Sequence, residues 1–318
     1  MKKMTKILLV AMMVLSLMIP ASLAENTPVV RVGGLNGPTG MALAHIMTEN
    51  DGTYEFTMAG APTELTAQII AGNVDIAAVP INLGSVLYNK TQGGVKGLSL
   101  ITRGMLYVLE KGDSIKSVSD LEGKNIVAAG QGSTPEYVTN YILDANNVKA
   151  NVEFKSEHAE VTTLALNGMA DIVLVPEPHV TNLMMKDPSF RVALDITEEF
   201  AAAAKKNGYD NAQLSMSVVI VRTEFYEAHP ELVAEFLNDL SASITFANEN
   251  VEKAAQEIAQ HGILPNAKVA EKALPSCALV YIAGEDMQAQ AAPLYEILHS
   301  ANPASVGGKV PGEDFYAK

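Results

Sequence analysis

Short β-prone runs alternate with longer runs of helical periodicity along most of the chain. Apolar residues are continuous or two positions apart in the short runs, and three to four positions apart in the longer ones. In the first part of the chain this pattern predicts strands at 28–35, 54–60 and 74–80 and helices at 40–50 and 63–72. The order is βαβαβ, which is typical of a parallel sheet covered by helices.

The same order of elements returns in the second part of the chain. Strands are predicted at 124–130, 152–157 and 170–176, and helices at 133–147 and 159–168. We therefore expect an α/β protein with two similar parallel-rich sheets, each covered by helices.

Two segments of seventeen residues, ninety-six positions apart, match without a gap. Residues 64–80 read ELTAQIIAGNVDIAAVP, and residues 160–176 read EVTTLALNGMADIVLVP. A repeated βα unit predicts two lobes that face each other across a cleft. Asp75 and Asp171 hold the same place in the two copies, after a helix-ending glycine. We interpret them as turn or strand-start residues and not as paired catalytic acids.

Two long β-prone runs flank the second unit, at 98–113 and 212–225. They predict two crossings between lobes, with the second lobe inserted into the first. The predicted first lobe comprises residues 25–107 and 216–318, and the predicted second lobe residues 108–215. From residue 228 onwards the chain is predicted to be helical and to pack on the first lobe.

The first 24 residues have the form of a secretory signal peptide. A lysine-bearing head precedes an apolar stretch at 7–19, and Ser22-Leu23-Ala24 is a small-x-small cleavage site. The apolar stretch is shorter than the ~20 residues that span a bilayer. Cleavage is expected near Ala24, and the signal region lacks the cysteine that a lipid anchor requires. We expect a periplasmic or extracellular protein.

Charge and cysteine content exclude several classes of partner. The chain has 22 Lys and Arg against 36 Asp and Glu, a net charge of −14, and no basic patch interleaved with aromatic residues, so nucleic acid is not an expected partner. Cys277 is the only cysteine, which excludes an internal disulfide and a metal site of several thiolates. Catalytic motifs such as HExxH and GxxxxGK are absent. We predict no cofactor, no metal and no catalytic residue.

The loops that follow the predicted strands are the candidate ligand site, because open parallel sheets bind ligands beyond the carboxyl ends of their strands. Glycine there allows close backbone approach, and helix N-termini offer unpaired N–H groups. The candidates in the first lobe are Asn36, Gly37, Thr39, Gly60, Thr63 and Asn82. Those in the second lobe are Gly132, Ser133, Thr134, His158, Glu177 and His179.

Ser133, with Pro135 and Glu136 after it, predicts a helix start with a capping box. Such an N-terminus favours an anion by ~0.3–1 kcal/mol. The alternative is that Ser133 and Thr134 only cap the helix. The two histidines of the second-lobe loops are either ligand contacts or structural residues.

Arg103 and Arg222 lie in the two β-prone runs that we expect to cross between lobes. Each arginine either grips a carboxylate or sulfonate with its guanidinium group or forms a salt bridge at the rim. Independently of these arginines, the helix starts with hydroxyls or glycines that face the predicted cleft favour a small, polar, anionic organic solute.

Four motifs resemble the periplasmic substrate-binding proteins of ABC importers: the repeat G-x-x-D-I-x-x-V-P, SVSDLEGKNI, GSTPEYVTNYIL and HPELVAEFLNDLSASI. The nearest group is similar to the nitrate, sulfonate, taurine and thiamine-precursor binding proteins (NMT1/THI5-like). The resemblance implies a two-lobed type II periplasmic-binding-protein fold, joined by two crossing strands. It also implies a monomer that closes on a solute and delivers it to a membrane permease served by a cytoplasmic ATPase.

Two alternatives to an import receptor stay open. One is an enzyme on the same fold, since some menaquinone-pathway dehydratases look like these proteins. The other is a secreted sensor that serves a membrane receptor. The chain has no tryptophan, so a flat aromatic ligand would stack on Tyr107 or Tyr137, or on no ring at all.

Overall fold

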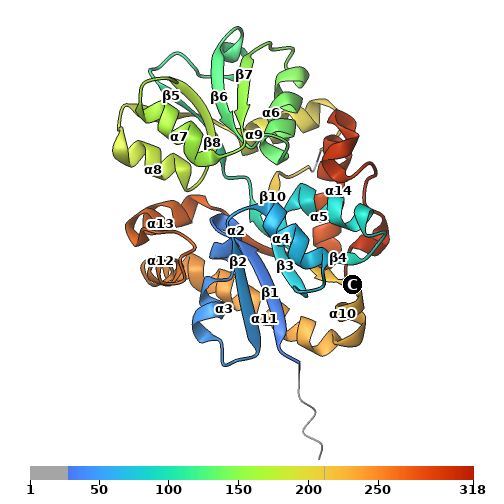
Figure 1. Cartoon of the computed structure of the whole chain (residues 1–318). Coiled ribbons are helices and arrows are strands. Elements are labelled where there is room, and N and C mark those ends of the chain that lie inside the picture. The colour runs from blue at the N-terminus through green and yellow to red at the C-terminus, as the bar shows by residue number, and fades with distance from the viewer. Residues whose placement is uncertain (1–27, 211) are drawn as a thin grey trace, which may run out of the picture.

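The computed structural model describes residues 28–210 and 212–318, and within them the chain forms two α/β lobes, each built on its own sheet (Figure 1). The predicted signal peptide and its cleavage site lie outside these residues.

The first described sheet has six strands in the order β11-β4-β10-β3-β1-β2. Their bounds are β1 Val30–Leu35, β2 Tyr54–Ala59, β3 Ile76–Pro80, β4 Val95–Arg103, β10 Ser215–Arg222 and β11 Leu279–Ala283. β1 pairs in parallel with β2 and β3, whereas β10 is antiparallel to both β3 and β4. The strand that follows the return from the second lobe, β10, therefore lies inside the first sheet, between β4 and β3.

The second described sheet has five strands in the order β7-β6-β8-β5-β9. Their bounds are β5 Leu106–Lys111, β6 Asn125–Ala129, β7 Asn151–Lys155, β8 Ile172–Pro176 and β9 Phe190–Asp195. Again the three strands of the βαβαβ unit are parallel, and the strand that enters from the other lobe, β5, is antiparallel to its neighbours. The two sheets thus share one topology, and the first adds β11 at its edge.

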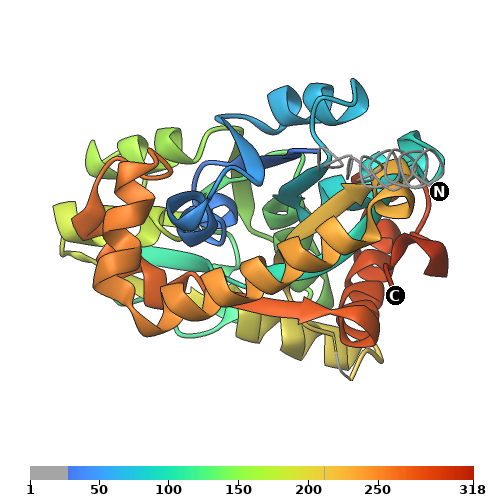
Figure 2. The same cartoon turned by 90° about the horizontal axis from the view of Figure 1, so that it is seen from below.

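Helices cover both faces of both sheets. On the first lobe they are α2 Pro38–Met41, α3 Ala44–Glu49, α4 Pro62–Ile70, α5 Ile81–Lys90, α10 Thr223–Ala228, α11 Pro230–Glu249, α12 Val251–Gln260, α13 Ala267–Ala273 and α14 Gly284–Ala301. On the second lobe they are α6 Thr134–Ala145, α7 His158–Leu166, α8 His179–Lys186 and α9 Ile196–Lys206. A 3₁₀ turn at 118–121 belongs to the second lobe, and 3₁₀ turns at 274–276, 303–306 and 313–315 belong to the first. Figure 2 shows the orange α11 lying along one face of the first lobe, where it contacts α3 and β11.

The two copies of the repeat fold alike. α4 and β3 in the first copy correspond position for position to α7 and β8 in the second. Gly72 and Gly168 end the two helices at φ +74° and +70°, a left-handed conformation that glycine adopts without the steric penalty of a Cβ. The prediction of a duplicated helix-to-strand unit is confirmed.

The chain crosses from the first lobe to the second at Gly104–Met105, between β4 and β5, and returns between α9 and β10. The predicted lobe boundary after residue 107 falls inside β5, and the boundary before residue 216 falls inside β10. A Cβ on Gly104 would collide with the hydroxyl of Thr197 and lie 2.8 Å from its Cβ and Cγ2. The first crossing is therefore packed directly against the start of α9.

Three local predictions were wrong. The helix predicted at 40–50 is broken at Ala42–Leu43 into α2 and α3. The region after 228 is not wholly helical, because Leu279–Ala283 pairs with β4 as β11. The run predicted as one crossing strand at 98–113 is two strands in different sheets, separated at Gly104. In each case a tertiary partner, absent from local periodicity, determines the outcome.

Candidate functional site

The carboxyl edge of the first sheet faces the second lobe, because β4 ends at the first crossing and β10 begins at the return (Figure 1). The lobes also contact each other through α13 with α8 and α14 with α6.

One hydrogen bond joins candidate loops of the two lobes. Asn82 lies in the first turn of α5, directly after β3, and Thr134 is the first residue of α6. The Thr134 hydroxyl donates to Asn82 Oδ1 at 3.2 Å, and both side chains are buried. The amide nitrogen of Asn82 donates to the Ser305 carbonyl at 3.5 Å. Two helix N-termini, one from each lobe, thus meet at this point.

Hydroxyl side chains gather where β4 ends and β10 begins. Thr39 and Ser217 share a hydrogen bond at 3.2 Å between Oγ1 and Oγ. Thr102 and Ser215 are fully buried, and their hydroxyl oxygens have no partner among the described residues. Of these four residues, only Thr39 is among the candidates predicted from the sequence. The other three are polar positions inside β-prone runs, and their only signal is that each lies at a strand end beside a crossing.

Arg103 is the last residue of β4, and its Nη2 donates to Gln290 Oε1 of α14 at 3.1 Å. Arg222 lies at the other end of β10, where Nη1 lies 3.4 Å from Asp75 Oδ1 and Nη2 lies 2.6 Å from Glu224 Oε2. The salt-bridge interpretation is therefore correct for Arg222. Arg103 forms no salt bridge with any described residue.

Glu177, which follows β8, is 3% exposed. Its carboxylate accepts hydrogen bonds from the Thr181 backbone N–H at 3.1 Å and the Thr181 hydroxyl at 3.0 Å. Burial raises the pKa of Glu177, and the two hydrogen bonds from Thr181 oppose part of this rise. Burial and the nearby Asp195 and Glu177 carboxylates raise the pKa of Tyr107 to about 12.

Cys277 belongs to the first lobe and is fully buried. Burial raises the pKa of its thiol, and the charge of Glu177 in the second lobe adds to this effect. Cys277 therefore lies in the first lobe within electrostatic range of the loop after β8.

His158 and His179 begin α7 and α8, and their rings contact edge to face with centroids 5.4 Å apart. Burial, and then the neighbouring His158, lower the pKa of His179 to about 4, and burial lowers the pKa of His158. His179 Nδ1 lies 3.4 Å from the Thr162 hydroxyl. Both imidazoles are thus neutral near pH 7 and pack against each other. A role for either ring in ligand contact stays a prediction.

The capping box predicted at Ser133 is wrong. Ser133 is the N-cap residue of α6, but its hydroxyl donates back to the Gly130 carbonyl at 2.8 Å and caps no N–H of the helix. Glu136 accepts from the N–H of Gly132 at 2.7 Å, one residue earlier than a capping box requires. Local side-chain bonds of this kind compete with capping, because serine can serve either neighbour.

The remaining candidates are mostly exposed loop residues. Asn36, Gly60, Thr63 and Gly132 are exposed. Gly37 is buried at φ +96° and donates its N–H to the Ile263 carbonyl at 3.3 Å. Their part in ligand binding stays a prediction.

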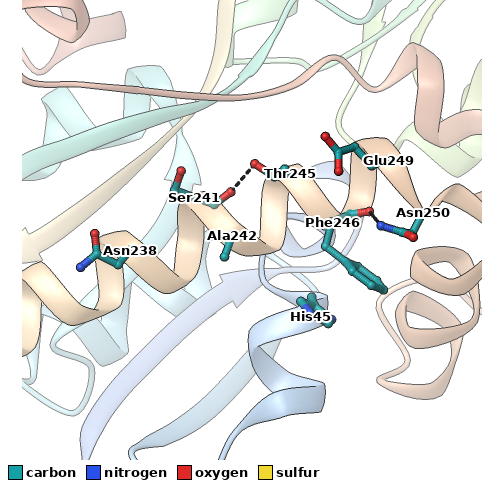
Figure 3. A pocket seen from close by; sticks show the side chains of 8 residues that line it. All are labelled: His45, Asn238, Ser241, Ala242, Thr245, Phe246, Glu249 and Asn250. Atoms are coloured by element: carbon teal, nitrogen blue, oxygen red, sulfur yellow. Dashed lines mark hydrogen bonds between the residues drawn. The ribbon is translucent and has the colours of Figure 1, made fainter.

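A shallow pocket of about 540 Å³ lies on the first lobe, lined by α11 residues and His45 (Figure 3). The rings of His45 and Phe246 stack with centroids 3.7 Å apart, and His45 Nδ1 lies 3.1 Å from Glu257 Oε2. Its lining residues come from the first lobe alone, so it is not the site between the lobes.

Within residues 28–210 and 212–318, no group of three or more histidine, cysteine or acidic side chains is arranged to hold a metal ion. None of the helices in those ranges is both long and apolar enough to cross a membrane.

Comparisons with known proteins agree with this architecture. Residues 95–254 match the family model described as NMT1/THI5 like. A search among curated proteins found no match to this sequence. An ABC transporter structure from Parabacteroides distasonis is similar with a TM-score of 0.77 and 20% identity over 91% of this chain and 99% of that one.

Two sulfonate-binding proteins share the fold. The periplasmic aliphatic sulphonate binding protein SsuA from Escherichia coli has a TM-score of 0.70 and 15% identity, covering 91% of each chain. The alkanesulfonate-binding protein SsuA from Xanthomonas axonopodis pv. citri, bound to MOPS, has a TM-score of 0.62 and 13% identity over 90% of this chain and 95% of that one. The predicted two-lobed periplasmic-binding-protein fold is confirmed.

Proposed function

Because this chain belongs to the NMT1/THI5-like family, we propose that it is the solute-binding receptor of an ABC import system. Its two lobes close on a small, polar organic solute and present it to a membrane permease, which a cytoplasmic ATPase drives. In this proposal the protein acts outside the cytoplasm as a monomer and carries out no chemical reaction on its solute.

The observation that carries the proposal is the meeting of loops from both lobes at Asn82 and Thr134. The hydrogen bond between them spans the interlobe boundary at 3.2 Å. A solute held at the same boundary would contact both helix starts at once, and closure would then couple its binding to the two crossings. The sheet topology supports this, since the loops after parallel strands are where open α/β sheets bind ligands.

We propose that the solute carries an anionic group at the first-lobe edge. The buried hydroxyls and Arg103 there are hydrogen-bond donors, whereas Glu177 on the second lobe is an acceptor when ionised. An anion beside an ionised Glu177 would be repelled, so that side suits a donor of the solute, such as an amino or hydroxyl group. The favoured class is therefore a small solute with an anionic group at one end and a donor at the other.

A thermal-shift panel tests the function. Sulfonates, carboxylates, nitrate and pyrimidines form the test set, and cationic and large apolar compounds form the control set. We expect a small anionic solute to raise the melting temperature by several degrees at saturation, since a ligand at 100 times its Kd stabilises by ≈ 2.7 kcal/mol. Stabilisation by the control set alone would contradict the anionic proposal.

Replacing Ser133 and Thr134 together with alanine tests the site. Thr134 loses its bond to Asn82 in this variant, so we expect a larger loss in solute affinity than in folding stability. Thr163→Ala is the matched control, because this exposed hydroxyl bonds only the Ala159 carbonyl of its own helix. An unchanged Kd in the double variant would show that Ser133 and Thr134 do not contribute to solute binding and have a structural role only.

A further inference from the structure

His158 and His179 form a pair of adjacent imidazoles at the carboxyl edge of the second sheet. His158 begins α7, which follows β7, and His179 begins α8, which follows β8. Their ring centroids are 5.4 Å apart, and both side chains are half-buried. α8 contacts α13 of the first lobe, so this edge faces the interlobe boundary.

The separation of the two rings is that of two imidazoles on one metal ion. Zinc binds imidazole nitrogen at about 2.0–2.1 Å with tetrahedral geometry, which puts the centres of two such rings about 5 Å apart. The observed 5.4 Å matches this separation. We therefore expect an ion to bind with rotation of the imidazoles and without movement of α7 or α8.

Thr162 of α7 joins the two histidines and determines the tautomer of His179. The Thr162 hydroxyl donates to the His158 carbonyl at 3.3 Å, and it lies 3.4 Å from His179 Nδ1. Because a hydroxyl has one proton, this group accepts from His179, and Nδ1 carries the hydrogen. The lone pair of His179 is then on Nε2, where it can bind a metal ion. Metal-binding histidines are commonly oriented by a hydrogen bond from their other ring nitrogen.

The pair belongs to the second lobe alone. The positions ninety-six residues earlier, in the first copy of the repeat, are Pro62 and Leu83. Those positions begin α4 and lie in the first turn of α5, so the same elements form there without histidine. The common framework of the two lobes therefore does not require the two imidazoles. Both are neutral near pH 7, which is the form of histidine that binds metal.

We infer that His158 and His179 form a binding site for one divalent transition-metal ion of the class that prefers imidazole, Zn²⁺, Ni²⁺ or Cu²⁺. Within residues 28–210 and 212–318, no third histidine, cysteine or acidic side chain completes the site. The other coordination positions are therefore left to water or to oxygen atoms of a solute. This site differs from the absence of a metal predicted from the sequence, and it does not depend on the receptor proposal.

Calorimetric titration of the chain without a purification tag, treated with EDTA and then dialysed, tests the site. We expect one Zn²⁺, Ni²⁺ or Cu²⁺ ion to bind per chain, most tightly for Cu²⁺. Mg²⁺ and Ca²⁺ are the controls, because both prefer oxygen ligands and should not bind here. If none of the three transition-metal ions binds, the inference is wrong.

Two histidine variants test the ligands. His158→Gln and His179→Gln each remove one imidazole and should raise the Kd of the metal ion at least tenfold. His229→Gln is the matched control, because His229 lies on the first lobe beside Glu231, and it should leave that Kd unchanged. An unchanged Kd in both His158→Gln and His179→Gln overturns the inference.

A threonine variant tests the orientation of His179. Thr162→Val removes only the hydroxyl that holds Nδ1, and we expect it to raise the Kd of the metal ion about tenfold. Thr163→Ala is its matched control, because the Thr163 hydroxyl bonds only the Ala159 carbonyl of its own helix. Equal metal affinities in these two variants contradict the role given to Thr162.

Nuclear magnetic resonance of the wild type locates the ion even if a variant fails to fold. Paramagnetic Ni²⁺ should broaden the imidazole signals of His158 and His179 before those of the other histidines. Earlier broadening elsewhere overturns the inference and leaves the receptor function standing. Repeating the thermal-shift panel in EDTA tests the receptor separately, since a solute that stabilises the metal-free protein supports that function whatever the metal result.

Discussion

Asp75 and Asp171 occupy the same place in the two copies of the repeat, yet the structure gives them opposite environments. Asp75 is 3% exposed and Asp171 is exposed. Asp75 Oδ2 accepts from Arg31 Nε at 2.8 Å and from the Arg31 backbone N–H at 3.1 Å, and Oδ1 lies 2.5 Å from Arg31 Nη2. Arg222 Nη1 adds a longer contact at 3.4 Å.

We expect Asp75→Asn to destabilise the protein by about 2–3 kcal/mol. Breaking a fully buried ion pair costs about 3–5 kcal/mol. The loss expected here is smaller, because the Arg31 side chain is 39% exposed and water can solvate it again. Asp171→Asn is the matched control. Asp171 accepts a hydrogen bond from the Lys111 N–H at 2.7 Å through its backbone carbonyl. Asp171→Asn leaves that carbonyl in place, so the variant should lose no more than about 0.5 kcal/mol of stability.

Urea unfolding followed by circular dichroism measures both variants against the wild type, with the midpoint and the slope fitted separately. A free-energy loss below about 0.5 kcal/mol for Asp75→Asn would refute the ion-pair argument. An equal loss in both variants would also refute it, because the effect would then belong to the shared turn and not to the arginine network.

Three further predictions follow from other contacts. Gly104→Ala should cost about 1–3 kcal/mol through overpacking against Thr197, and Thr197→Ala should relieve part of that loss in a double-mutant cycle; additive losses would contradict the contact. The pKa of His179 is lowered to about 4 in the fold, so between pH ~6.5 and pH ~4 the unfolded state binds a proton that the folded state does not. The free energy of unfolding should therefore be highest above pH ~6.5 and fall by up to about 3 kcal/mol as the pH drops to ~4, and His179→Gln should flatten that slope in pH-dependent unfolding. Cys277 is buried with a raised thiol pKa, and iodoacetamide at pH 8 should label it only on unfolding; rapid native labelling would contradict its burial.

The repeat made the fold predictable because it combines two independent signals at the same spacing. Gly72 and Gly168 end their helices in a left-handed conformation, and the apolar runs that follow are buried strands in both sheets. Local chemistry and tertiary environment agree there. They disagree at Leu279–Ala283, where a short β-prone run surrounded by helices becomes a strand only because β4 offers an open edge.

The candidate site was less predictable because burial and partners decide it. Thr134 and Asn82 follow strands and could be named from the sequence, but their mutual bond depends on how the two lobes meet. Ser133 has the right spacing for a capping box and bonds Gly130 instead. Thr102 and Ser215 have no local pattern at all, since their interest arises from the hydroxyl partners that they lack.

The central place of β10 has a consequence for the order in which the protein folds. This strand pairs with β3 and β4, which precede the second lobe in sequence, and it is synthesised after that lobe is complete. The second lobe is one continuous stretch, so its contacts are closer in sequence and need less loop closure. The first lobe therefore cannot complete its sheet until the second lobe has been synthesised, and the second lobe is the unit able to fold first.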